Sequence, residues 1–216
     1  MAKRKSPSEK VISAVLDIIE EDGWAAVTMA AAARRASVPL AEVRAAFSDR
    51  QAVLDAYLSG IDQAVLEATA QDEVTDESPR DRLFDVIMRR FDALAPRKAA
   101  LQNLLMAATR DPAISICGSG RLATSMRWML EAAGLCAAGP VGALKTVGMA
   151  ALYASVFRVW LKDESPDMSK TMAALDKALD RAERLYKGLC KACKFKRHSA
   201  TDIDQDTDDM EAAAPA

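Results

Sequence analysis

The stretch "VTMAAAARRASVPLAEVRAAFSDR", Val27 to Arg50, has the layout of two short helices joined by a tight turn. Thr28 can cap a first helix that runs through Ala36, and Pro39 is tolerated at or just before the first position of the second. A helix that crosses the phosphate backbone, followed by a short helix that could lie in a major groove, is typical of a helix-turn-helix.

Further helices are expected on both sides of this stretch. Apolar residues recur at helical spacing from about Ser8, a residue type that caps helices, to Asp22, and Gly23 suits a left-handed exit from that helix. Asp49 can cap a longer helix that ends near Ala70. The first three helices therefore form an N-terminal head, and the fourth leads away from it.

The remainder of the chain predicts a larger helical body. The polar segment "QDEVTDESP" at residues 71–79 is the best linker in the chain, and Ser78 followed by Pro79 has the pattern of an N-cap and a first helical position. Breaks that contain Pro and Gly separate five further expected helices, at about residues 79–94, 97–109, 120–133, 140–162 and 166–193.

Composition agrees with an all-α protein of about nine helices. Of 216 residues, 50% are hydrophobic but only 5% are aromatic, and alanine recurs throughout, which favours close-packed helices over sheets. The formal net charge of −2 excludes a protein coated in positive charge, so any contact with nucleic acid must come from a local patch.

The sequence lacks an apolar signal-peptide core after its first basic residues, and its four cysteines are irregularly spaced, so a cytoplasmic protein is expected. The most apolar run, residues 139–161, is interrupted by Lys145 and Arg158. Its uncharged part is too short for a bilayer, which needs about 20 apolar residues, and we expect a buried helix rather than a membrane span.

Neither an enzyme, a cofactor nor a metal site is predicted. The sequence has one histidine, no Gly-rich phosphate loop, and no nucleophile beside a recognisable base. Cys190, Cys193 and His198 offer three metal ligands where a structural zinc site usually has four. A redox switch at the two cysteines stays an alternative.

The N-terminal stretch resembles the DNA-binding domain of the TetR family of transcriptional regulators. The residues that match the family pattern are Gly23, Val27, Thr28, Ala33, Arg34, Arg35, Ala36, Val38 and Phe47. Three positions depart from it: Ser37 replaces the usual turn glycine, Arg44 a phosphate-binding tyrosine, and Arg50 a lysine. The order of a short head, a linking helix and five more helices extends the likeness over almost the whole chain.

This resemblance implies a cytoplasmic homodimer, a repressor that binds a palindromic operator in double-stranded DNA and is released by a small apolar ligand. It assigns residues 1–50 to a basic arm and DNA-binding head, 51–195 to a ligand-binding and dimerisation domain, and 196–216 to a disordered acidic tail. The expected DNA contacts are Lys3, Arg4, Lys5, Thr28, Arg34, Arg35, Arg44 and Arg50.

Arg44 is the chief candidate for reading a base, whereas Glu42 faces the same groove and would be repelled. The head is only marginally basic, because residues 1–50 hold eight Lys and Arg against seven Asp and Glu. Adaptable methionines and large aromatic residues could line an apolar ligand pocket, although ordinary core packing also explains each one. The candidate pocket residues are Met88, Met106, Trp128, Met129, Met149, Phe157 and Trp160.

A second resemblance stays open beside the first. Gly23 and Trp24, with "WLKDESPDMSKTMAALDKAL" at residues 160–179, look like a TetR-fold lipid-binding accessory family of ubiquinone biosynthesis. That likeness implies a carrier of an isoprenoid ubiquinone precursor that does not bind DNA. Helix capping by Ser165, with Pro166 in the first helical turn, would account for part of it.

Overall fold

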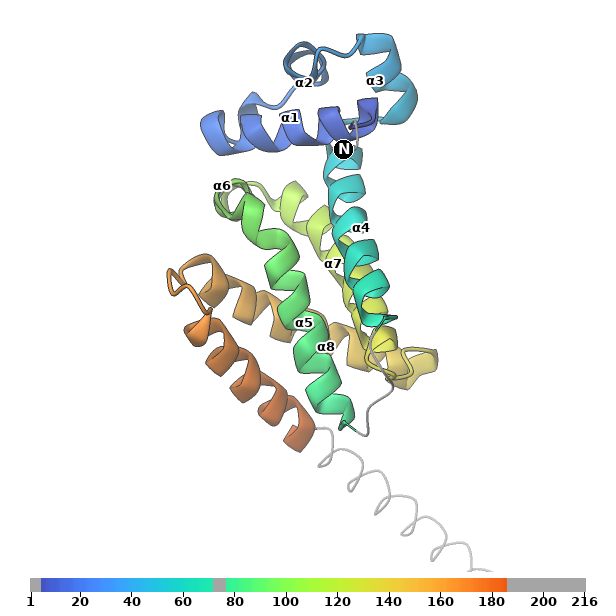
Figure 1. The fold of residues 1–216 in the computed structure, drawn as a ribbon, viewed down its shortest axis with the longest axis vertical. Helices are drawn as coiled ribbons and strands as arrows, with labels where there is room; N and C mark the ends of the chain where they lie inside the picture. The colour runs from blue at the N-terminus through green and yellow to red at the C-terminus, as the bar shows by residue number, and fades with distance from the viewer. Residues whose placement is uncertain (1–4, 72–76, 186–216) are drawn as a thin grey trace, which may run out of the picture. The chain divides into compact units, whose positions relative to one another are not determined.

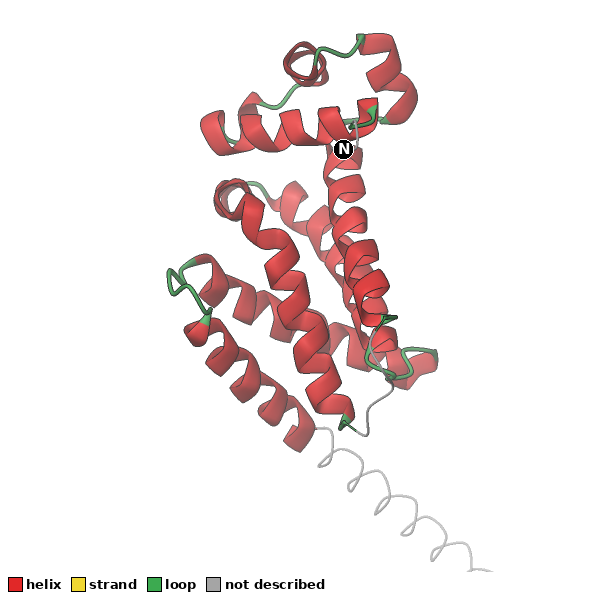
Figure 2. Ribbon diagram, viewed as in Figure 1, coloured by secondary structure: helices red, strands yellow, loops and turns green. Residues whose placement is uncertain are grey.

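The computed structural model describes residues 5–71 and 77–185, apart from the side chains of residues 112–117. These residues form helices, turns and loops without a strand, as Figure 2 shows, and the predicted all-α fold is confirmed. The chain divides into two units, Met1–Leu175 and Asp176–Ala216. Cys190, Cys193, His198 and the acidic tail lie outside the described residues, as do Lys3 and Arg4.

The head contains α1 (Pro7–Asp22), a short 3-10 helix η1 (Trp24–Ala26), α2 (Met29–Ala36) and α3 (Leu40–Ala46) (Figure 1). Ser6, not Ser8, caps α1, because Pro7 follows at the first helical position and Glu9 completes a capping box. Gly23 ends α1 with a φ of 81°, a conformation that favours glycine.

The helix-turn-helix forms as the sequence predicts. The Thr28 hydroxyl accepts a hydrogen bond of 3.1 Å from the Ala31 amide and so caps α2. Ser37 ends α2 in the left-handed region with a φ of 53°, and Pro39 directly precedes α3. The turn therefore keeps the geometry that a glycine usually supplies, although a serine occupies the position.

The body contains α4 (Arg50–Thr69), α5 (Pro79–Leu94), η2 (Ala95–Arg97), α6 (Lys98–Arg110), α7 (Pro112–Ala132) and α8 (Gly139–Leu161). Another helix occupies residues 169–185. The predicted start of α7 at Gly120 is wrong. The helix begins at Pro112, whose fixed φ suits a first helical position, and continues through Gly118 and Gly120.

Within a single chain, the α8 helix is buried on one side only. Tyr153, Val156 and Trp160 are buried, whereas Val141, Leu144 and Val147 are exposed, Leu144 by 61%. Among the described helices, α8 is the one that is long and apolar enough to cross a bilayer, judged by length and composition. Its buried side is that of a core helix.

A buried carboxylate closes the turn after α8. The Asp163 side chain accepts hydrogen bonds from the amide of Ser165 at 3.1 Å and from the amide and hydroxyl of Thr171 at 2.8 and 2.7 Å. Pro166 lies in a turn rather than in the first turn of a helix, and the helix begins at residue 169. The predicted start at residue 166 is therefore wrong, because the cap reaches over a longer loop.

Polar contacts fix the head to the body. On η2, Arg97 donates to the carboxylate of Asp17 at 2.5 Å and to the hydroxyl of Ser13 at 2.8 Å, both on α1. On α6, the Asn103 amide donates to two carbonyls in the last turns of α1, those of Ile19 and Glu20. The apolar core of the head extends to Ala100 of α6.

Candidate functional site

Two of the predicted DNA-contacting arginines are free. Arg34 on α2 and Arg44 on α3 are exposed, and neither makes a hydrogen bond or ion pair with any part of the chain that the structure describes. Lys5 is also exposed, beside the start of α1. These three side chains can reach a phosphate or a base without giving up an internal partner.

Arg35 is already paired within the head. Its guanidinium donates two hydrogen bonds to the carboxylate of Glu21 on α1, one of them at 2.6 Å, and its Nε lies 4.0 Å from Asp17. The hydrogen bonds from Arg35 lower the pKa of Glu21. The arginine thus holds α2 against α1, and a phosphate would have to compete with that pair.

Arg50 is held inside the head as well. At the start of α4, its Nη1 donates to the carbonyl of Trp24 at 3.1 Å and to that of Val27 at 3.3 Å. The guanidinium carbon lies 4.5 Å from the centroid of a Trp24 ring, within the range of a cation–π contact. Arg50 therefore fixes the loop that leads into α2.

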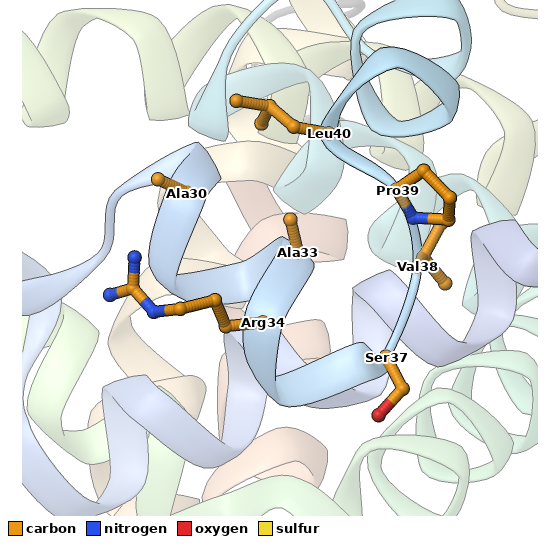
Figure 3. Close-up of a pocket in the computed structure, with 7 residues that line it drawn as sticks. All are labelled: Ala30, Ala33, Arg34, Ser37, Val38, Pro39 and Leu40. Atoms are coloured by element: carbon orange, nitrogen blue, oxygen red, sulfur yellow. The ribbon is translucent and has the colours of Figure 1, made fainter.

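A shallow hollow of about 470 Å³ lies between α2 and α3. Figure 3 shows it lined by Ala30, Ala33, Arg34, Ser37, Val38, Pro39 and Leu40. Its walls are mostly apolar, and the free side chain of Arg34 supplies its charge. Leu40, the first residue of α3, is 52% exposed.

The outward face of α3 is narrow and rich in alanine. Val43 is buried beneath the helix, so Ala41 and Ala45 lie on the opposite side, where helical spacing places them. Glu42 and Arg44 flank that face, and both are exposed. The face therefore has small alanine side chains, which would let the walls of a DNA groove approach closely, with one cation and one anion at its edges.

The seven predicted pocket residues differ in burial. Met129, Met149 and Trp160 are buried, and Met88 and Phe157 are half-buried. Met106 and Trp128 are each 54% exposed. None of the seven residues lines the hollow between α2 and α3, or the smaller one between the start of α1 and Arg35.

The interior of the body instead holds a cluster of polar and charged side chains. Asp62 of α4 accepts from Arg90 of α5 at 3.2 Å, and from Arg121 and Ser125 of α7 at 3.0 and 2.5 Å. Arg90 also donates to the hydroxyl of Tyr153 on α8. Four helices therefore contribute to this Asp62–Arg90 cluster, whose members apart from Arg121 are buried.

An aromatic cluster adjoins the charged one. The Tyr153 ring stacks on Phe91 with centroids 5.2 Å apart, and on Phe157 at 5.9 Å. Trp160 packs against Phe91 at 5.3 Å and Phe157 at 5.4 Å. Two of the predicted pocket residues, Phe157 and Trp160, thus meet here, next to the guanidinium of Arg90, which lies 4.9 Å from the Tyr153 ring centroid.

Comparison with known proteins gives a clear result for the fold. A TetR transcriptional regulator from Nitrosomonas europaea aligns over 83% of this chain and 99% of its own, with 22% identity and a TM-score of 0.67. A TetR transcriptional regulator from a Rhodococcus species aligns over 80% of this chain and 95% of its own, with 21% identity and a TM-score of 0.56. The chain has the TetR fold. No protein-family model and no curated protein matches the sequence.

Within this TetR fold, the contacts of Asp163 involve part of the sequence pattern behind the second resemblance. The residues of "DESPDMSKT", 163–171, include the buried carboxylate and two of its hydrogen-bond donors, Ser165 and Thr171. The pattern therefore has a structural role in ending α8 and starting the next helix.

Sequence reasoning missed the Asp62–Arg90 cluster, although a signal was present. Arg90 lies four residues after Val86 and four before Leu94, and both are buried. A charged residue in the apolar stripe of an amphipathic helix indicates a buried partner. Its acceptor could not be named, because Asp62 lies 28 positions away on another helix.

Proposed function

We propose that the protein is a TetR-like transcriptional regulator, a repressor that binds double-stranded DNA as a homodimer and is released by a small apolar ligand. The observation that carries the proposal is the formed helix-turn-helix, with one exposed arginine on each of its helices, Arg34 on α2 and Arg44 on α3, neither of them paired among the described residues. The TetR fold supports the same conclusion, although a fold alone does not establish a function.

The contacts divide into positioning and reading. Arg34 and Lys5, with the capped N-terminus of α2 at Thr28, are suited to phosphates, which carry no sequence information. Arg44 lies on the flank of α3 and is suited to the O6 and N7 atoms of a guanine. Lys3 and Arg4 would extend the basic arm. Arg35 and Arg50 act in this proposal by holding the head in shape.

A second copy of the chain is the proposed occupant of the exposed face of α8. Val141, Leu144 and Val147 form an apolar row there, at the helical spacing of a packing surface. Replacing Leu144 with glutamate should convert the dimer to a monomer in light scattering. The matched change Ala64→Glu, at an exposed position of α4, should leave the dimer intact. A dimer in the Leu144 variant would contradict the proposed interface.

A dimer would place two heads in successive major grooves, so the proposed operator is palindromic. The ligand belongs to the body in this proposal, and the protein would act in the cytoplasm. The joint of Arg97 and Asn103 with α1 connects the body to the head, so a change in the body can alter the separation of the two heads.

Fluorescence anisotropy tests the proposal with the purified protein, a duplex from upstream of its own coding sequence and a scrambled duplex, at several salt concentrations. Tighter binding to the upstream duplex with a steep salt dependence supports the regulator. Weak binding that is equal on both duplexes contradicts it and favours the isoprenoid carrier. Solvent extraction and mass spectrometry would then identify the carried lipid.

A further inference from the structure

We propose that the Asp62–Arg90 cluster anchors the carboxylate of an acidic ligand with an apolar chain or ring. The proposal rests on the proposed function in one respect, that the helical body is the ligand-binding part of the protein. It narrows the small apolar ligand of that function to an apolar acid, because the Asp62–Arg90 cluster carries a net positive charge.

The cluster holds more positive than negative charge. Arg90 and Arg121 each bring a guanidinium, which stays protonated in proteins, and Asp62 brings the carboxylate that contacts both. The other partners, Ser125 and Tyr153, are neutral hydroxyls. Burial raises the pKa of Tyr153, which keeps that hydroxyl protonated. The cluster therefore carries one net positive charge, and its partly exposed member Arg121 can present that charge to a ligand.

One buried polar atom of the cluster also lacks a hydrogen-bond partner among the described residues. It is the Nε of Arg121. An incoming carboxylate can accept a hydrogen bond from this donor and adds the missing negative charge.

Arg121 provides the approach to the cluster. Its side chain is 20% exposed, whereas that of Arg90 is 4% exposed. Arg121 contacts Asp62 through Nη2, so its Nε can donate to a second carboxylate while the bond to Asp62 is kept. A ligand that enters at Arg121 would therefore complete the charge balance of two cations and two anions without breaking the existing contacts.

The neighbouring aromatic cluster defines the rest of the ligand. Phe91, Tyr153, Phe157 and Trp160 form a continuous set of ring contacts beside Arg90, and Phe157 is only half-buried. Phe91, Tyr153 and Trp160 are buried, so Phe157 offers the apolar surface of the cluster to a ligand. Such a surface near a fixed cation suits a molecule with an apolar body and one anionic end. A neutral alcohol of the same length would leave the charge unbalanced, and an alkylammonium would be repelled.

Calorimetric titration of the full-length protein with decanoate, and separately with decanol, below their aggregation limits tests this assignment. Decanoate should bind at least about tenfold more tightly than decanol, because the alcohol cannot supply the charged hydrogen bond. Arg121→Gln should reduce the affinity for decanoate by about tenfold. The matched control Arg127→Gln, at an exposed position of the same helix, should bind decanoate as the unmodified protein does.

Arg121→Lys is a second variant that keeps the charge but removes the Nε donor, and it should weaken decanoate binding less than Arg121→Gln. Equal binding of decanoate and decanol, no decanoate binding, or unchanged binding in Arg121→Gln would overturn the proposal. Each titration is done without DNA, so a failure of ligand binding is separate from a failure of DNA binding in the anisotropy assay.

Discussion

Replacing Arg50 with methionine tests whether this residue holds the head together or contacts DNA. The change keeps a long apolar side chain but removes two hydrogen bonds, to the carbonyls of Trp24 and Val27, and the contact with the Trp24 ring. For a half-buried guanidinium the hydrogen bonds together contribute about 1.5–2 kcal/mol and the cation–π contact about 0.5–1 kcal/mol. The free energy of unfolding should therefore fall by about 2–3 kcal/mol.

For a chain of this size, that loss lowers the thermal midpoint by about 4–12 °C. Circular dichroism during heating measures it, with Arg34→Met as the matched control. Arg34 has no partner among the described residues, so its replacement should change the free energy by less than about 0.5 kcal/mol. The reasoning is refuted by the opposite pattern, an unchanged midpoint for Arg50→Met together with a shallower salt dependence of DNA binding.

Three further predictions concern the head and the turn after α8. Arg44→Ala should lower operator affinity by about 1–3 kcal/mol and change the base preference, whereas Arg34→Ala should weaken binding to all sequences alike. Fluorescence anisotropy with a set of base-substituted duplexes measures both effects. Equal losses in the two variants would contradict the special role of Arg44. Ser37→Gly should raise the free energy of unfolding by about 0.5–1 kcal/mol, and the thermal midpoint with it, because residue 37 has a φ of 53°, which glycine adopts more readily than serine. A lower midpoint would contradict this prediction. Burial alone would raise the pKa of Asp163, but hydrogen bonds from Ser165 and Thr171 lower it well below its usual range. The stabilisation by this carboxylate is thus complete above the unfolded pKa of about 4 and is lost progressively as the pH falls from there towards the lower pKa of the folded protein. The loss of stability in Asp163→Asn, measured by denaturant unfolding, should therefore shrink on acidification. A loss that does not depend on pH would contradict this prediction.

The head was predictable because its signals are local. Thr28 caps the helix that follows it within three residues, and Asp49 does the same for α4. Ser37 and Pro39 mark the turn between α2 and α3. Capping and turn chemistry depend on neighbouring residues, and so a single sequence contains them.

The roles of the charged residues were less predictable, because their partners are distant in sequence. Arg35 reaches Glu21 across 14 positions, and Arg50 reaches Trp24 across 26. Arg90 meets Tyr153 across 63 positions. Periodicity shows which face of a helix is apolar, but it does not show which carboxylate or carbonyl the fold brings to a given arginine.

Footprinting of the DNA upstream of the coding sequence tests the central claim most directly, that this head is a sequence-specific DNA reader used in pairs. The account predicts two protected half-sites of inverted sequence whose centres lie about one helical turn, 10–10.5 base pairs, or a multiple of it apart. Arg44→Ala should raise the protein concentration needed for protection by about 5- to 150-fold, and Glu67→Gln, at an exposed position of α4, should leave it unchanged. Uniform cleavage along the upstream DNA at every protein concentration below the onset of nonspecific binding would contradict the account.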